Sequence, residues 1–292
     1  MTHARPSLPE PITTLLDRRP APEPALLPEE LRAAYGGDLR FPPAPAGRPY
    51  VAGNFVGTLD GVVSFEAAGK SGGGNISGFD EADRFIMGLL RASADAVIVG
   101  KGTLHATAPA HLFVGGYVYP QAGALFARYR EEVLRKPAPP LNVVVSGSGD
   151  VDLSRAVFRT PQVPALLITT EAGRESLCRN GTQLPACAQV RTLAGPPVAP
   201  AAILDLLRAE FGVSLLLHEG GPVLFGDFLA HGLVDELFLT VAPQLAGRGT
   251  ERPRPGVIAG VEFSPETAPW LEIVSVKQRA NHLYLRYAMR ET

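Results

Sequence analysis

A glycine-rich corner that carries an acidic residue stands out near position 220. The chain runs Leu215-Leu-Leu-His-Glu-Gly-Gly-Pro222, which is an apolar stretch followed by an acid, two glycines and a proline. Gly220 and Gly221 let a ligand approach the backbone, and Pro222 suits the first turn of a helix. The free N–H groups of that turn attract an anion, ideally a phosphate, beside the carboxylate of Glu219. The corner predicts a nucleotide-cofactor enzyme, and an ordinary tight strand-to-helix turn is the alternative.

A second glycine-flanked corner follows the apolar stretch Ala94–Val99. Gly100-Lys-Gly-Thr103 places a cation and a hydroxyl between glycines, which suits a phosphate group. The corner imitates the beginning of a Rossmann fingerprint, but His105 occupies the third glycine position, so this signal is weak. A plain loop with a solvated Lys101 is the alternative.

Polar residues also follow the first apolar stretch after residue 49. Thr58 and Asp60 lie in Asn54-Phe-Val-Gly-Thr-Leu-Asp-Gly61, and Gly69-Lys-Ser-Gly-Gly-Gly-Asn75 comes shortly after. Both side chains are suited to a polar substrate. Asp60-Gly61 is also a favoured pair for a hairpin turn, so a structural role for Asp60 stays open.

Arg91 and Glu219 are charged residues at positions where a charge is either useful or costly. Arg91 closes a predicted helix, where the helix dipole favours a cation, and a guanidinium also suits a phosphate or a pair of heterocyclic carbonyls. Glu219 would be costly as an unpaired charge at a buried strand end, so a substrate amine or a protein donor should meet it. Capping and substrate binding stay open for Arg91, and Glu219 is a candidate for relaying a proton.

The elements that must position these residues follow from apolar periodicity. Strands alternate with helices after residue 49, which is typical of a mostly parallel sheet with helices on both faces. The predicted strands are Tyr50–Val56, Ala94–Val99, Leu141–Ser146, Ala165–Thr169, Val190–Leu193, Val213–His218 and Val234–Ala242. The predicted helices are Phe79–Arg91, Gln121–Arg135, Ala199–Phe211 and Val223–His231, and Leu271–Lys277 with His282–Ala288 form a C-terminal antiparallel hairpin.

The first 48 residues differ in composition from the rest of the chain. They are rich in Pro and Ala, and Pro42-Pro43-Ala44-Pro45 closes them like a linker. Ile12–Arg18 and Pro28–Tyr35 are predicted as short helical fragments. We therefore expect residues 1–48 to form an arm, packed on the surface or on a partner subunit, and residues 49–292 to form one domain.

Composition excludes several classes of protein. A net charge of −2 over 292 residues, with no basic block, argues against nucleic acid or an anionic membrane as the main partner. No apolar run approaches the roughly 18–20 residues that cross a bilayer, and the N-terminus lacks a secretory core, so cytoplasmic residence is expected. The two cysteines match no zinc or redox motif, and the zinc deaminase signature is missing, so no metal is expected.

Taken together and in this order, the corners resemble the pyrimidine reductase family of riboflavin biosynthesis, which is related to dihydrofolate reductase. The resemblance is carried by Thr58-Leu-Asp-Gly61, Leu90–Thr103, Glu219-Gly-Gly-Pro222 and Gly232–Pro243. It implies a dihydrofolate-reductase-like α/β fold that binds NADPH across the carboxyl ends of the strands, in agreement with the general rule for open α/β sheets.

The resemblance also implies a role for each matching residue. The cofactor positions are Gly57, Lys101, Gly102, Thr103, Thr107, Ser146 and, for the pyrophosphate, Gly220, Gly221, Pro222, Val223, Leu224 and Phe225. Lys101 would hold the ribose 2′-phosphate, which favours NADPH over NADH. The substrate positions are Thr58, Ser71, Arg91 and Glu219, and the candidate catalytic acids are Glu219 and Asp60. A homodimer formed through the strand region Leu233–Val241 is implied as well.

The sequence departs from the family pattern after Thr103. Leu104–Gly115 lacks the family's acidic pair, and it lacks the arginine that helps hold the ribose phosphate. Thr107 stands where an acidic cofactor contact is expected, and Gly72–Gly74 replace bulkier residues. The sequence thus predicts an NADPH-dependent reductase of a pyrimidine- or pterin-like substrate, with 5-amino-6-(5-phosphoribosylamino)uracil first. The alternatives are a divergent reductase of folate-like or secondary-metabolite substrates and, least favoured, a nucleotide-binding paralogue without turnover.

Overall fold

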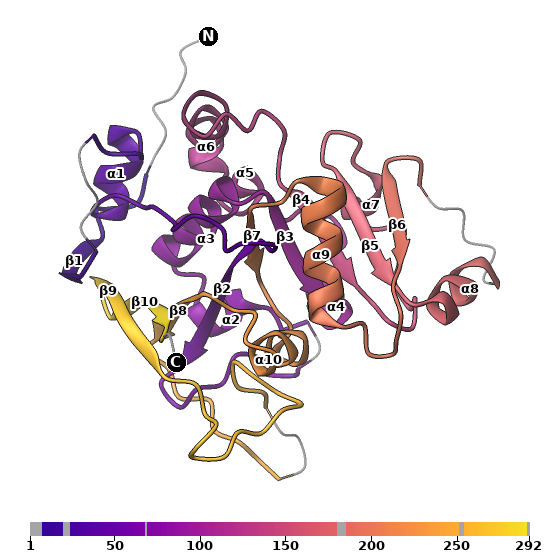
Figure 1. The fold of residues 1–292 in the computed structure, drawn as a ribbon. Helices are drawn as coiled ribbons and strands as arrows, with labels where there is room; N and C mark the ends of the chain where they lie inside the picture. The colour runs from indigo at the N-terminus through magenta and orange to yellow at the C-terminus, as the bar shows by residue number, and fades with distance from the viewer. Residues whose placement is uncertain (1–7, 20–23, 68, 180–184, 251–253, 291–292) are drawn as a thin grey trace.

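The structure is a computed structural model that describes residues 8–19, 24–67, 69–179, 185–250 and 254–290. A single sheet runs through it (Figure 1). Its ten strands are ordered β1-β9-β10-β8-β2-β7-β3-β4-β5-β6. Their bounds are β1 Thr13–Asp17, β2 Tyr50–Thr58, β3 Ala96–Gly100, β4 Leu141–Val145, β5 Ala165–Thr169, β6 Ala188–Thr192, β7 Leu215–His218, β8 Glu236–Ala242, β9 Leu271–Arg279 and β10 His282–Met289. The α-helices are α1 Glu29–Tyr35, α2 Gly73–Ser77, α3 Glu81–Ser93, α4 Lys101–Ala106, α5 Gly115–Val118, α6 Gly123–Arg128, α7 Ala156–Arg159, α8 Glu171–Arg179, α9 Pro200–Phe211 and α10 Pro222–Ala230.

The sheet has a parallel part and an antiparallel part, as the sequence predicts. Strands β8, β2, β7, β3, β4, β5 and β6 run parallel to one another, whereas β10, β9 and β1 continue the sheet in antiparallel pairing. Every residue of β4 and β5 is buried, which fits their composition, apolar except for Asn142 and Thr169. The predicted α/β fold class and the predicted C-terminal hairpin are both confirmed.

Helices cover both faces of the parallel part. Alternate side chains of each strand point to opposite faces, so each strand contributes to two cores. Val97 and Val99 of β3 join a core that contains side chains of α1, α3 and α6. Ala96 and Ile98 of the same strand join the opposite core, formed with α9 and α10. Figure 1 shows α9 in front of the sheet.

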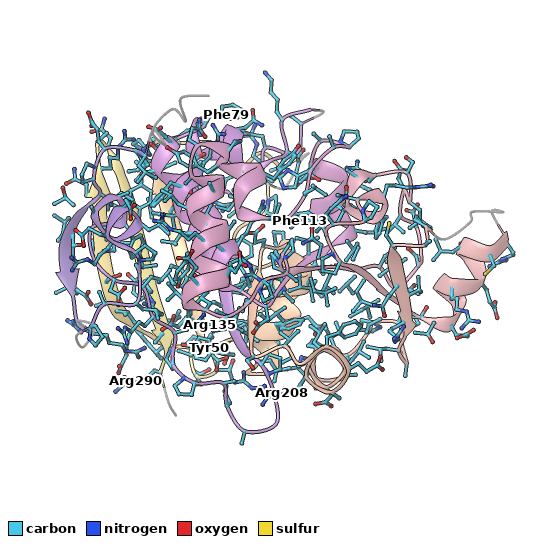
Figure 2. The ribbon with its side chains drawn as sticks, turned by 90° about the horizontal axis from the view of Figure 1, so that it is seen from above. Tyr50, Phe79, Phe113, Arg135, Arg208 and Arg290 are labelled. Carbon is cyan, nitrogen blue, oxygen red and sulfur yellow. The ribbon has the colours of Figure 1, made fainter. Side chains whose placement is uncertain are left out.

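The two edges of the parallel strands can be located in Figure 2. Tyr50 begins β2, Arg135 precedes β4 and Arg208 precedes β7. These three residues lie toward one margin of the view, which therefore holds the amino ends of the strands. Phe79 lies at the opposite margin, directly after α2, which packs against β2 and β8. The glycine-rich corners lie at this second margin, where the parallel strands have their carboxyl ends; we call it the carboxyl edge of the sheet.

The prediction of a helix at Ile12–Arg18 is wrong. Thr13–Asp17 is an edge strand, β1, whose residues pair antiparallel with Ser275 to Gln278 of β9. The two adjacent β-branched threonines favour an extended chain, and the pairing with β9 overrides the short helical pattern. The helix predicted at Pro28–Tyr35 is confirmed as α1.

The N-terminal segment is built into the core of the molecule. Ile12, Leu31 and Leu39 are buried in the same cluster as side chains of β2 and α3. Residues 1–7 and 20–23 of the predicted arm lie outside the described residues. The division of the chain at residue 48 stays a prediction.

The helix predicted at Gln121–Arg135 is divided in the structure. A 3-10 turn at Pro120–Ala122 leads into α6, and a π-helical turn follows at Tyr129–Val133. The wider turn carries Arg130, whose buried guanidinium donates to the carbonyls of Ala92 and Ala94 at the end of α3. This long-range contact, which a local pattern does not contain, accounts for the irregular turn.

Candidate active site

The strand order brings the two predicted phosphate corners side by side. β7 lies between β2 and β3, so the turn after β7 adjoins the turn after β3. Glu219 N–H donates to the carbonyl of Ile98 at 3.0 Å, and Gly100 N–H donates to the carbonyl of Gly220 at 2.9 Å. The hydroxyl of Thr103 lies 3.3 Å from the point where a Cβ on Gly220 would stand. The corners therefore form one continuous surface at the carboxyl edge.

The turn after β7 requires glycine and exposes backbone donors. Gly220 has φ +100, a conformation that side chains rarely adopt, and its peptide bond to Gly221 is cis. Gly221 is the N-cap of α10 and makes no side-chain capping bond, with Pro222 at the first helical position. Phe225 N–H already donates to the carbonyl of Gly221. The free donors of the first turn are thus those of Val223 and Leu224.

His218, which the sequence analysis did not select, supports this turn from below. Its side chain is fully buried, and Nδ1 accepts a hydrogen bond from Gly220 N–H at 3.1 Å. The rings of Phe225 and Phe228 lie edge-on to the imidazole, with centroids 5.1 and 5.0 Å away. Burial lowers the pKa of His218 to about 3, so the ring is neutral. A histidine that ends an apolar strand directly before Glu-Gly-Gly was the available signal.

The turn after β4 adds further polar groups to the same surface. β4 pairs with β3 up to Val145, which lies opposite Gly100, so Ser146 follows one residue beyond that level. Ser146 is 2% exposed, and its hydroxyl has no hydrogen-bond partner among the described residues. A buried hydroxyl without a partner is unusual and points to a ligand or an ordered water.

Lys101 reaches from the second corner to the loop after β4. Its ammonium lies 2.9 Å from a carboxylate oxygen of Asp150 and 3.4 Å from the hydroxyl of Ser148. Both members of this ion pair are largely exposed, so the pair adds little stability. The ion pair lowers the pKa of Asp150. Ser148 and Asp150 are not among the residues predicted from the sequence, although Ser146-Gly-Ser-Gly-Asp150 carries the glycine and polar pattern of the other corners.

The remaining predicted cofactor residues differ in how they face this surface. In the described structure nothing lies within 4 Å of the point where a Cβ on Gly102 would stand, so its backbone is open to a ligand. Thr107 ends α4 and bonds its hydroxyl to the carbonyl of Leu104. Gly57 lies inside β2, and a Cβ there would touch Val62, Val63 and Leu239. The side chain of Phe225 belongs to the core.

Thr58 and Asp60 lie at a different level of the carboxyl edge. β7 ends at His218, opposite Gly53 of β2, and β2 continues for five residues to Thr58. At about 3.3 Å per residue the end of β2 lies roughly 16 Å beyond the end of β7. The edge is therefore stepped, and the turn at Thr58–Asp60 is distant from Glu219.

The turn at Thr58–Asp60 holds a neighbouring loop. The Thr58 hydroxyl donates to Asp60 at 2.6 Å and accepts from Val62 N–H. The Asp60 carboxylate also accepts from the N–H groups of Ala246 and Gly247. These bonds hold the pKa of Asp60 well below its usual range, and the bond from Thr58 has the largest effect. The geometry favours the structural alternative for Asp60, since an ionised, fully bonded carboxylate is a poor proton donor.

Arg91 and Glu219 meet in a buried ion pair. Arg91 Nε donates to Glu219 Oε1 at 2.8 Å and Nη2 donates to Oε2 at 2.7 Å. The two side chains are 2% and 7% exposed. Of the two expected partners of Glu219, a protein donor or a substrate amine, the structure shows a protein donor, Arg91.

The same guanidinium also contacts residues 111–113, in the segment after α4 that departs from the family pattern. Arg91 donates to the carbonyl of Leu112 and to His111 Nε2, both at 3.3 Å, and lies 5.3 Å from the centre of the Phe113 ring. Burial lowers the pKa of His111 to about 3, so it accepts this bond as a neutral ring. Arg91 therefore connects α3, the end of β7 and residues 111–113. Within the described residues its guanidinium makes no hydrogen bond to its own helix.

The predicted site residues thus fall into groups that the structure separates. Gly220, Gly221, Lys101, Thr103 and Ser146 lie together at the ends of β7, β3 and β4. The Arg91–Glu219 pair lies beside them and is bonded within the protein. Ser71 donates its hydroxyl to the carbonyl of Ala67, in the segment between β2 and α2.

A comparison with protein families decides the relationship of the chain. The family model described as the RibD C-terminal domain matches residues 49–283. The chain belongs to the RibD C-terminal domain family. This membership confirms the resemblance found in the sequence, and it covers the sheet from β2 into β10 together with both corners.

Named relatives of this RibD C-terminal domain come from archaea and bacteria. The 2,5-diamino-6-ribosylamino-4(3H)-pyrimidinone 5′-phosphate reductase of Archaeoglobus fulgidus is 29% identical over 218 residues, which cover 74% of this chain and 89% of that protein. The riboflavin biosynthesis protein RibD of Escherichia coli is 29% identical over 204 residues, which cover 69% of this chain and 50% of that protein. The chain thus spans about half the length of this RibD relative.

Solved structures share the fold. RibD of Acinetobacter baumannii aligns with a TM-score of 0.61 at 21% identity and covers 84% of this chain and 59% of that chain. A pyrimidine reductase-like protein of Corynebacterium diphtheriae aligns with a TM-score of 0.60 at 21% identity and covers 84% and 93%. Within the described residues, no helix has the length and apolar character to cross a membrane.

Proposed function

We propose that this chain is an NADPH-dependent reductase of riboflavin biosynthesis that acts on a phosphoribosylamino-pyrimidine. Family membership supports reductase chemistry, and the Archaeoglobus fulgidus reductase matches over 89% of its own length. In the proposed reaction the ribosylamine, in its ring-opened form, gains a hydride and a proton and becomes a ribitylamine. The observation that carries the proposal is the joining of the corners after β7 and β3 into one surface.

The residues of that surface fit the chemical parts of NADPH. The N–H groups at the start of α10, beside Gly220 and Gly221, suit the pyrophosphate, together with the Thr103 hydroxyl. The unpartnered hydroxyl of Ser146 offers a donor within the same surface. Lys101 suits the 2′-phosphate, for which it would exchange its exposed partner Asp150. When bound, NADPH supplies the hydride, and the protein orients it against the substrate.

The carboxylates predicted as catalytic acids are proposed here to position other groups. Both oxygens of Glu219 accept from Arg91, so Glu219 fixes the guanidinium and, through it, residues 111–113. Asp60 fixes the loop at Ala246 and Gly247. With these carboxylates occupied, water is the proposed source of the proton.

A second candidate is a reductase of a folate-like or other heterocyclic substrate. It is favoured by Leu104–Gly115, which lacks the acidic pair of the family pattern and the arginine expected for the ribose phosphate. In the structure this segment presents His111 and Phe113 to Arg91 instead. The pathway substrate stays first because of the named relative.

An assay of NADPH oxidation by absorbance tests the proposal. Turnover with the phosphoribosylamino-pyrimidine is the expected result, and turnover with dihydrofolate alone would select the second candidate. Binding of NADPH without turnover on either substrate would favour a nucleotide-binding paralogue. Failure of the folded chain to bind NADPH in calorimetry would overturn the proposal as a whole.

The proposal includes a homodimer in the cytoplasm. Both edges of β8 pair within the chain, with β2 and β10, so the region Leu233–Val241 offers no free strand edge. A contact there would use the partly buried side chains of Leu237, Leu239 and Val241 on one face of β8. Light scattering at micromolar concentration should give twice the chain mass, and a monomer mass would remove this part of the proposal.

A further inference from the structure

A separate cavity of about 220 Å³ lies between the N-terminal segment and the antiparallel strands. Its walls include Arg19, Tyr35, Phe41, Ser275, Lys277 and Arg286. Arg286 pairs with Phe238 of β8, which lies opposite Asn54 in the middle of β2. The cavity is therefore at mid-sheet, separated from β7 by the width of β8 and β2. Figure 1 shows β1 and α1 on the side of the molecule that carries β9 and β10, far from β6.

The three arginines at this cavity share two carboxylates, Glu236 and Asp38, and Asp17 lies in the cavity wall as a third. Arg286 donates through Nε and Nη2 to buried Glu236, and Nη2 also donates to the carbonyl of Arg40. Arg19 bonds the second oxygen of Glu236 at 3.1 Å. Arg40 forms an ion pair with Asp38 at 2.9 Å. The Nη1 atom of Arg286 makes no hydrogen bond within the described residues and remains available.

Lys277 carries a positive charge that forms no ion pair with a carboxylate of the described residues, although Asp17 attracts it from a distance. It is 3% exposed, and Nζ donates to the Thr14 hydroxyl at 2.7 Å and to the carbonyl of Gly36 at 2.8 Å. The ammonium lies 4.3 Å from the centre of the Tyr35 ring. Asp17 and Asp38 also line the cavity, yet neither forms an ion pair with Lys277. Burial of an unpaired ammonium is costly, and it lowers the pKa of Lys277 to about 8.

The dimensions and walls restrict the kind of ligand that would balance this charge. The cavity is smaller than the roughly 300–1,000 Å³ of sites for drug-sized ligands, so it excludes a dinucleotide. The Phe41 ring, with the Arg286 guanidinium 5.3 Å from its centre, and the Tyr35 ring supply flat apolar surface. One excess positive charge matches one carboxylate better than a phosphate monoester, which carries about −1.5 to −2.

We propose that this cavity is a binding site for a small aromatic or heterocyclic monocarboxylate, whose carboxylate bonds Lys277 and Arg286. The body of the ligand lies between the rings of Tyr35 and Phe41. The site is independent of the proposed reductase activity, because no residue of the corner surface lines the cavity.

Calorimetric titration of the full chain with benzoate at pH 7 tests this site. We expect saturable binding, at least about tenfold weaker binding in Lys277→Met, and unchanged binding in Arg174→Gln, which removes an exposed charge on α8. Saturating NADPH should leave benzoate binding unchanged, and competition would place benzoate in the active site and reject the cavity. Absence of saturable binding, or tighter binding of inorganic phosphate, would overturn the proposed ligand class.

A pH series on the unaltered chain keeps the test valid if Lys277→Met does not fold. Benzoate binding should weaken as the pH rises from 7 to 10, because Lys277 loses its proton while benzoate stays ionised. The other groups that face Lys277 are Asp17 from β1, Tyr35 from α1, Asp38 and Arg40 after α1, Arg19 after β1 and Arg286 from β10. Burial raises the pKa of Tyr35 to about 12, so it stays neutral in this range. Binding that is independent of pH between 7 and 10 would overturn the role of Lys277.

Discussion

The two halves of the candidate active site are built in opposite ways. At the ends of β7, β3 and β4 polar groups keep hydrogen-bonding capacity: the Ser146 hydroxyl has no partner among the described residues, and α10 begins without a side-chain cap. The residues predicted to hold the substrate are bonded to the protein itself, as in the Arg91–Glu219 pair and the Asp60 turn. We propose that the first half receives a ligand and that the second half is structural.

The largest effect is expected from breaking the buried ion pair. Arg91→Met should lower the free energy of unfolding by about 3–5 kcal/mol, because Glu219 stays buried without its partner. Urea denaturation measures this loss. Arg128→Met, which breaks an exposed pair with Glu30, should cost less than about 1 kcal/mol. A raised KM for a phosphorylated substrate, with stability unchanged, would show that Arg91 serves the substrate and not the fold.

Removing Glu219 together with Arg91 sharpens the same point. The double variant Arg91→Met with Glu219→Leu should be more stable than Arg91→Met alone, because no uncompensated charge remains buried. A double variant that loses as much as the sum of the two single variants would contradict direct coupling of the pair.

The next effect concerns the glycine turn of the first half. Gly220→Ala should weaken NADPH binding by about 1–3 kcal/mol, because alanine at φ +100 is strained and its Cβ would approach the Thr103 hydroxyl. Calorimetry measures the affinity. Gly232→Ala is the control, since Gly232 also has positive φ but meets nothing within 4 Å in the described structure. Equal losses of NADPH affinity in both variants would indicate general strain and not a cofactor turn.

A smaller effect should distinguish the two nicotinamide cofactors. Lys101→Gln should weaken NADPH binding by about 1–2 kcal/mol and leave NADH nearly unchanged, because only NADPH carries the 2′-phosphate. Asp150→Asn should strengthen NADPH binding up to about fivefold, since it frees Lys101 from an exposed ion pair. Parallel titrations with both cofactors make the comparison. Equal losses for NADPH and NADH in Lys101→Gln would reject the 2′-phosphate role.

The corners were predictable because their signals are local. Gly220, Gly221 and Pro222 specify a strand-to-helix turn within three residues, and the apolar runs around them specify strands. The pairing of Arg91 with Glu219 was not predictable from local signals, since 128 positions separate them and β7 is inserted between β2 and β3. The cost of an unpaired buried charge predicted that Glu219 has a partner. Only the strand order identifies that partner.

The same distinction explains what the sequence left open or did not predict. Ile12–Arg18 has a weak local pattern, and its conformation is decided by pairing with β9, about 260 positions away in sequence. Asp60 carries the local signature of a hairpin turn, but its bonds to Ala246 and Gly247 bring together distant loops. His218 was overlooked because a histidine at the end of an apolar strand has no spacing motif. Its role depends on the rings of Phe225 and Phe228 in the following helix.

The smallest predicted effect is the most selective test of the first half. Ser146→Ala removes a buried hydroxyl that has no partner among the described residues, so the free energy of unfolding without cofactor should be unchanged or raised by up to about 1 kcal/mol. NADPH binding should weaken by about 1 kcal/mol, because the cofactor loses a hydrogen bond. Thr169→Val is the matched control on the neighbouring strand, where the hydroxyl donates to the carbonyl of Ser146 at 2.7 Å. That variant should lose about 1 kcal/mol of stability with little change in affinity. If both variants lose stability and neither loses affinity, Ser146 belongs with the bonded, structural half of the edge.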